Sequence, residues 1–122
     1  MNDFNFNFYV VAILVLILYK ALQRKRINSV TPENVKKMLI NKTGILVDVR
    51  TKEEYQNKKI PNSISIPLAV IAEQIGNKVP NKETEIVVYC QSGSRSARAV
   101  KILEKKGYEN VSNFGSINRW SF

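Results

Sequence analysis

The sequence has no histidine, and Cys90 is the single cysteine among its 122 residues. Without histidine the chain lacks the commonest zinc ligand and the usual general base, so Cys–His and Ser–His catalysis are both excluded. One cysteine forms no intrachain disulfide and no multi-cysteine metal site. We therefore expect neither a metal nor a cofactor. If Cys90 reacts, backbone dipoles and arginines must activate it, and any second thiol must come from another molecule.

Acidic residues are scarce, with 10 against 19 lysines and arginines, for a net charge of +9. Four of the positive charges, Lys20, Arg24, Lys25 and Arg26, lie near the N-terminus, and most of the others are scattered along the chain. The sequence has no basic stripe interleaved with aromatic residues, which is the pattern of nucleic-acid sites. It therefore predicts a solvated basic surface and no nucleic-acid partner.

The one long hydrophobic stretch covers residues 4–22, in which only Asn5, Asn7 and Lys20 are strongly polar. A helix of this length spans roughly 28 Å, close to the hydrocarbon core of about 30 Å in a bilayer. We therefore predict a single transmembrane helix over residues 4–22. A buried core helix and a cleaved signal peptide are the alternatives.

The charges that flank this stretch favour an anchor that is not cleaved. Asp3 precedes it and the basic segment KALQRKR ends it, which is the reverse of a signal peptide. Because lysine and arginine favour the cytoplasmic side, we predict a single-pass membrane protein with its C-terminal domain in the cytoplasm. On this interpretation residues 1–28 form the anchor and a basic linker, and residues 29–122 form one domain.

Apolar runs typical of strands alternate with helical patterns across residues 29–122. A capping threonine, Thr31, precedes the first helix of this part, whose first residue is Pro32. Strands are predicted at residues 45–50, 62–66, 86–90 and 110–114, and further helices at residues 53–57, 68–75 and 96–106. This order predicts an α/β domain with a mainly parallel sheet flanked by helices.

Cys90 stands where the strand at residues 86–90 meets the following helix. Ligands of parallel sheets bind at the carboxyl ends of the strands, so this position favours chemistry. The segment at residues 92–94, Ser-Gly-Ser, lets the backbone curl with its N–H groups inward and bind an anion. The helix that starts near Arg95 or Ser96, and the Arg95 charge, are expected to lower the thiol pKa. The alternative is an inert buried cysteine.

The loop of residues 90–96 fits the pattern Cys-x-x-Gly-x-Arg-Ser and resembles the active loop of the single-domain rhodaneses, a family of sulfurtransferases. Three further segments resemble motifs of this family in the same order: LVDVRTKEEY at residues 46–55, IPNSISIP at 60–67, and GSINRW at 115–120. The last corresponds to the family's Gly-Gly-Ile-x-x-Trp. Four motifs in order are far more specific than one.

The resemblance implies a sulfurtransferase whose fold is rhodanese-like. Cys90 would take a sulfane sulfur from thiosulfate or a persulfide, become a persulfide, and pass the sulfur to a thiol or another nucleophile, with Arg95 as the second catalytic residue. The residues that would bind the substrate sulfur are Gln91, Ser92, Gly93, Ser94 and Ser96. Asp48 and Arg50 would support the loop, and the alternative for this pair is a surface ion pair at a strand end.

The alternatives to a sulfurtransferase are a cysteine-dependent phosphatase or arsenate reductase and a binding module. Phosphatases and arsenate reductases with a related fold use Cys-x5-Arg, one residue longer than the loop from Cys90 to Arg95, and the shorter loop suits a single sulfur atom better than a phosphoryl group. A membrane-tethered binding module without chemistry is a further alternative. Gln91 stands where relatives that use thiosulfate often have arginine or lysine, which weakens the case for a dianionic donor.

Overall fold

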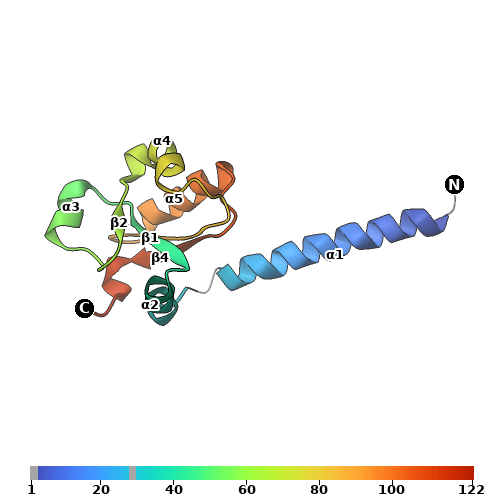
Figure 1. Ribbon diagram of the computed structural model, residues 1–122, viewed down its shortest axis with the longest axis horizontal. Coiled ribbons are helices and arrows are strands. Elements are labelled where there is room, and N and C mark those ends of the chain that lie inside the picture. The colour runs from blue at the N-terminus through green and yellow to red at the C-terminus, as the bar shows by residue number, and fades with distance from the viewer. Residues whose placement is uncertain (1–2, 28–29) are drawn as a thin grey trace.

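Helices and strands alternate along the chain in the computed structural model, which describes residues 3–27 and 30–122 (Figure 1). The elements, in chain order, are α1 (Asp3–Ile27), α2 (Pro32–Asn41), β1 (Gly44–Asp48), α3 (Lys52–Asn57), β2 (Ile64–Ser65), α4 (Leu68–Lys78), β3 (Glu85–Cys90), α5 (Ser94–Lys105), β4 (Val111–Ser116) and the 3₁₀ helix η1 (Ile117–Arg119). Thr31 caps α2 by accepting a hydrogen bond from the Asn34 N–H, as predicted. The α/β fold is confirmed.

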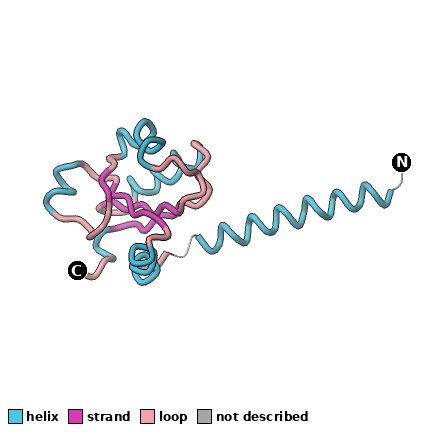
Figure 2. Tube along the Cα trace, viewed as in Figure 1, coloured by secondary structure: helices cyan, strands magenta, loops and turns pink. Residues whose placement is uncertain are grey.

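The four strands form one sheet in the order β2-β1-β3-β4, and each of its pairings is parallel. In the centre of the sheet, Val47 of β1 pairs with Val88 of β3. The strands lie between helices (Figure 2), which explains why β1 and β3 are apolar almost throughout. Because the strands are parallel, the segments that follow β1, β3 and β4 meet at one edge of the sheet.

Helices cover both faces of the sheet. In Figure 1, α2 lies on one face, and α4 and α5 lie on the other. The α2 face is packed with large apolar side chains, chiefly Val35, Met38, Leu46, Tyr89 and Phe114. The face of α4 and α5 is packed with a second apolar cluster, which includes Val47, Val88, Ile71, Ile75, Ala99 and Leu103. Cys90 belongs to this second cluster, so the core itself holds the cysteine in place.

Gly44 begins β1 and lies between Met38 of α2 and Glu85 of β3. A Cβ atom at this position would lie 2.6 Å from the Met38 sulfur and 2.7 Å from the Glu85 carbonyl oxygen. We expect Gly44→Ala to lower the free energy of unfolding, measured by urea denaturation, by about 1–3 kcal/mol because the backbone oxygen cannot move aside. The control is Gly76→Ala on α4, where a Cβ meets nothing within 4 Å. Equal effects at the two sites would contradict this interpretation.

Several predicted boundaries differ from the structure. Helix α5 begins at Ser94, two residues before the predicted start, because Gly93 caps it in a left-handed conformation without a side-chain hydrogen bond. The strand predicted at residues 62–66 is only two residues long, since Asn62 has a φ of 66° and turns the chain. Strand β4 continues past the predicted residue 114 to Ser116, where η1 follows.

Helix α1 includes the hydrophobic stretch and continues through the basic segment that was predicted as a linker. Its window Asn5–Leu22 is long and apolar enough to cross a membrane, and none of it is buried. Figure 1 shows α1 extending away from the sheet and its helices. The alternative of a buried core helix does not fit this exposure. Asn28 and Ser29, where the predicted linker ends and the predicted domain begins, lie outside the described residues.

Candidate active site

Cys90 is the last residue of β3 and is fully buried. The chain then turns within three residues, and α5 begins at Ser94. Gly93 makes this turn with a φ of 102°, a conformation that a residue with a side chain rarely adopts. The cysteine therefore lies between a strand end and a helix start, with its sulfur facing the inside of the turn.

Two groups, one in the turn and one in α5, contact the Cys90 sulfur. The backbone N–H of Gly93 donates a hydrogen bond to Sγ at 3.0 Å, and the Ser96 Oγ lies 3.4 Å from it. Burial by itself raises the pKa of the thiol. Hydrogen bonds from the Ser96 hydroxyl and from the N–H groups of Ser96, Gly93 and Ser92 outweigh burial, so the Cys90 pKa is lowered. The site favours a thiolate nucleophile.

The hydroxyls of Ser92 and Ser94 do not contact the Cys90 sulfur. They are exposed and lie 3.5 Å from each other. Ser92 takes part in the site through its backbone N–H, and Ser94 is the first residue of α5. Of the loop serines, only Ser96 therefore brings its side chain to the sulfur.

Arg95 forms an ion pair that the sequence analysis did not foresee. Its Nη1 donates to Glu54 Oε1 at 2.7 Å and its Nη2 to Glu54 Oε2 at 3.0 Å. Glu54 also accepts a hydrogen bond from the Thr51 N–H, in the capping box of α3. The hydrogen bond from Arg95 is the main cause that lowers the pKa of Glu54 to about 2. Arg95 therefore joins α5 to α3, and Glu54 neutralises much of its charge.

Glu54 is absent from the residues predicted for the site, although two signals in the sequence could identify it. It belongs to the segment LVDVRTKEEY, which resembles a family motif. It also stands three residues after Thr51, the spacing of a capping box. Neither signal indicates that the ion-pair partner of Glu54 is Arg95, which is 41 positions away.

Asp48 and Arg50 form a buried ion pair at the end of β1, with side chains 0% and 3% exposed, so the alternative of a surface ion pair does not hold. Arg50 Nε and Nη2 donate to the Asp48 carboxylate, and Nη2 also donates to the Lys58 carbonyl. Nη1 donates to Gln91 Oε1 at 3.3 Å. Arg50 therefore contacts the residue that follows Cys90, so the ion pair lies next to the cysteine loop.

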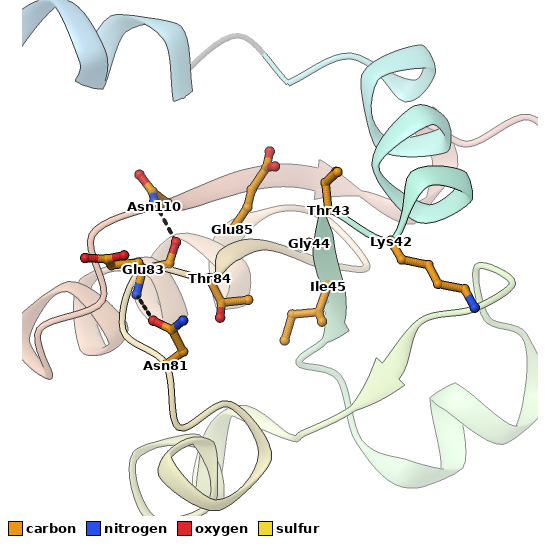
Figure 3. A pocket seen from close by; sticks show the side chains of 9 residues that line it. All are labelled: Lys42, Thr43, Gly44, Ile45, Asn81, Glu83, Thr84, Glu85 and Asn110. Atoms are coloured by element: carbon orange, nitrogen blue, oxygen red, sulfur yellow. Dashed lines mark hydrogen bonds between the residues drawn. The ribbon is translucent and has the colours of Figure 1, made fainter.

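A cavity of about 580 Å³ lies at the opposite edge of the sheet, where β1 and β3 begin. Figure 3 shows its lining, which includes Lys42, Gly44, Glu83, Glu85 and Asn110. The predicted site residues are absent from this lining, so the cavity is separate from the cysteine loop. Within residues 3–27 and 30–122, no group of three or more His, Cys, Asp or Glu side chains is arranged to hold a metal ion.

Residues 31–122 match the family described as the rhodanese-like domain. The chain belongs to this family. It is 39% identical over 71 residues to the thiosulfate sulfurtransferase PspE of Escherichia coli strain K12, covering 58% of this chain and 68% of the relative. It is 36% identical over 88 residues to the thiosulfate:glutathione sulfurtransferase of Saccharomyces cerevisiae, covering 62% of this chain and 63% of that relative.

Solved rhodaneses have the same fold. An Escherichia coli rhodanese whose structure contains anions is 35% identical to this chain, with a TM-score of 0.62 over 65% of this chain and 93% of the other. The human single-domain sulfurtransferase TSTD1 is 25% identical, with a TM-score of 0.67 over 75% of this chain and 93% of the other. The family and these named relatives support rhodanese-type sulfurtransferase activity for this chain.

Proposed function

We propose that Cys90 carries a sulfane sulfur as a persulfide. Its thiolate attacks the outer sulfur of the donor, the S–S bond of the donor breaks, and the remaining fragment leaves with the electron pair, as sulfite if the donor is thiosulfate. An acceptor thiolate then attacks the outer sulfur of the persulfide, takes it as its own persulfide, and releases the Cys90 thiolate. The second transfer restores the enzyme.

The observation that carries this proposal is the environment of Sγ. The Gly93 N–H and the Ser96 hydroxyl contact a thiol whose pKa is lowered despite burial. The same inward N–H groups suit the negative charge on the outer sulfur of a persulfide. Relatives named for thiosulfate and glutathione support a small anionic donor and a thiol acceptor.

The phosphatase alternative fits this geometry less well. A phosphatase needs its loop arginine to hold the equatorial oxygens of the phosphoryl group. Here both outer nitrogens of Arg95 are already paired with Glu54.

The test is to offer the protein thiosulfate with cyanide, glutathione persulfide with a thiol, and an aryl phosphate. Sulfur transfer without phosphate release supports the proposal. Release of phosphate that requires Cys90 supports the phosphatase, and absence of both activities supports the binding module.

Gln91 is expected to set the preference among sulfur donors. Its side chain is neutral and its Oε1 accepts a hydrogen bond from Arg50. Gln91→Arg adds a cation where sulfite departs, so we expect kcat/KM for thiosulfate to rise roughly threefold to tenfold. Gln91→Met, which loses the Arg50 contact without adding charge, is the matched control. An unchanged kcat/KM in Gln91→Arg would show that this position does not select the donor.

We also propose that residues 4–22 anchor the protein in a membrane, with the domain in the cytoplasm. The exposed apolar surface of α1 and the basic residues in its C-terminal part support this topology. Because Cys90 is buried, the test uses new cysteines, Asp3→Cys or Ser121→Cys, in a Cys90→Ser background. An impermeant thiol reagent is expected to label Asp3→Cys in intact cells and Ser121→Cys only after lysis.

The opposite labelling pattern would reverse the topology. Release of the full chain from membranes by alkaline carbonate would contradict the anchor itself. A chain that begins at residue 29 lacks the apolar helix and is expected to remain soluble and folded. Aggregation of that shorter chain would indicate that its core needs α1.

A further inference from the structure

The end of β4 packs directly against the catalytic loop. Ser116, the last residue of β4, pairs with Cys90 in the sheet register. A Cβ atom added to Gly93 would lie 3.5 Å from the Gly115 Cα, so the two glycine backbones are in contact. The end of β4 therefore packs against the outer side of the turn that surrounds the sulfur.

Two side chains of β4 bind carbonyl groups of this loop. The Ser116 hydroxyl donates to the Gln91 carbonyl oxygen at 2.6 Å and accepts from the Asn118 N–H at 3.1 Å. Asn113 Nδ2 donates to the Gly93 carbonyl at 3.3 Å. The Gln91 carbonyl oxygen has no proton, so the Ser116 hydroxyl is the donor and the carbonyl oxygen is the acceptor. The direction of that hydrogen bond is therefore defined.

The planar peptide unit between Gln91 and Ser92 links the Ser116 hydrogen bond to the surroundings of the Cys90 sulfur. In a trans peptide the C=O and the N–H point in opposite directions. When Ser116 holds the Gln91 carbonyl on the β4 side, the N–H of Ser92 in the same peptide unit points away from β4. This N–H is one of those that lower the Cys90 pKa, together with the Gly93 N–H at 3.0 Å.

Ser116 is a residue at which this chain differs from the family motif. The motif that GSINRW resembles has a second glycine there. Glycine has no hydroxyl and cannot make this hydrogen bond, so a rhodanese with glycine must orient the same peptide by other means. The bond between Ser116 and Gln91 is thus a feature of this chain and not a requirement of the motif.

We propose that Ser116 is a positioning residue, whose hydroxyl holds the Gln91–Ser92 peptide so that the Ser92 N–H faces Cys90 Sγ. The inference rests on the proposed function, because it assigns Ser116 to the reactivity of the same cysteine. Ser116 does not touch the sulfur, and it acts through a single peptide unit. Its effect is therefore expected on the charge state of the thiol and on the rate of sulfur loading.

The test compares Ser116→Ala, Ser116→Gly and Ser116→Thr with the wild-type full-length protein. Thiolate is measured by its absorbance at 240 nm as the pH is raised, with Cys90→Ser as the blank that removes the tyrosine signal. Because Cys90 is the only cysteine, the difference reports one group. Ser65→Ala is the matched control, since the buried Ser65 hydroxyl has no hydrogen-bond partner in the described structure.

In Ser116→Ala and Ser116→Gly, the midpoint of the thiolate titration is expected to move to higher pH. Sulfur loading at neutral pH should slow roughly threefold to tenfold, the effect of losing one hydrogen bond between neutral groups. Ser116→Thr keeps the hydroxyl and should restore both values, while Ser65→Ala should change neither. An unchanged midpoint in folded Ser116→Ala or Ser116→Gly overturns the proposal, and so does an equal shift in Ser65→Ala.

The two readouts separate this inference from the proposed function. If wild-type protein loads no sulfur while the titration midpoint still responds to Ser116, the sulfur-transfer proposal fails and the positioning role stands. If loading is normal and the midpoint ignores Ser116, the positioning role fails alone. Thermal unfolding of each variant shows whether a change in the midpoint comes from the site or from a loss of fold.

Discussion

Cys90→Ser is expected to abolish sulfur transfer, with a fall in kcat/KM of at least about a thousandfold. A serine hydroxyl is a far weaker nucleophile at neutral pH and has no sulfur on which to form a persulfide. Histidine is absent from the chain, so the usual general base that could activate a serine is missing. The measurement is steady-state transfer from thiosulfate to cyanide.

The fold is expected to survive this change. Oxygen is smaller than sulfur, and the Gly93 N–H and the Ser96 hydroxyl remain available to bind it. We therefore expect the circular dichroism spectrum and the thermal midpoint of Cys90→Ser to stay close to those of the wild type. Residual transfer near the wild-type rate in a folded Cys90→Ser variant would show that the sulfur does not pass through this residue.

Arg95→Ala and Glu54→Gln are expected to slow sulfur loading by similar factors, on the order of tenfold each. Either change breaks the two-pronged ion pair that joins α5 to α3, at 2.7 and 3.0 Å. Because the two residues act as a unit, the double variant should lose little more than either single variant. The measurement is the rate of sulfur uptake in a single turnover.

The sequence suggested that Arg95 acts through its positive charge, and Glu54→Gln separates that role from a structural one. If Arg95 acted only through its positive charge on the thiolate, Glu54→Gln would unmask that charge and speed up loading. If the pair instead holds the loop in place, Glu54→Gln slows it. Arg95→Lys, which keeps the charge but loses the two-pronged geometry, should retain only part of the rate. Faster loading in Glu54→Gln would support the charge-only interpretation.

The acid stability of the protein offers an independent check of the same ion pair. The hydrogen bond from Arg95 is the main cause that lowers the pKa of Glu54, from 4.5 to about 2. A lowered pKa means that the pair stabilises the fold fully above the unfolded value and loses this contribution as the pH falls toward 2. The thermal midpoint of Glu54→Gln should therefore depend less on pH between about 4.5 and 2 than that of the wild type.

Local sequence signals predicted most of the secondary structure. The apolar run that ends at Cys90 identified the central strand, because a strand covered on both faces must be apolar throughout. Thr31 with Pro32 identified the start of α2 through their hydrogen-bonding and backbone preferences. The boundaries that were missed depend on backbone geometry. Gly93 starts α5 through a left-handed turn, and Asn62 shortens β2 in the same way.

The parts of the site that the sequence did not reveal are tertiary contacts. Asp48 and Arg50 are two residues apart, so a pair could be predicted, but the hydrogen bonds of Arg50 to the Lys58 carbonyl and to Gln91 depend on the tertiary fold. Arg95 meets Glu54 only because α3 and α5 follow strands whose carboxyl ends lie at one edge of the sheet. The cysteine could be predicted, whereas the residues that position its loop required the fold.

Mass spectrometry of the intact protein after incubation with a sulfur donor tests the central claim most directly. With one cysteine and no internal disulfide available, a loaded enzyme can only be the Cys90 persulfide. The account predicts one added sulfur atom, its removal by cyanide or by a small thiol, and no added mass in Cys90→Ser. A wild-type protein that takes up no sulfur from either thiosulfate or glutathione persulfide, or that takes up equal sulfur in Cys90→Ser, would contradict it.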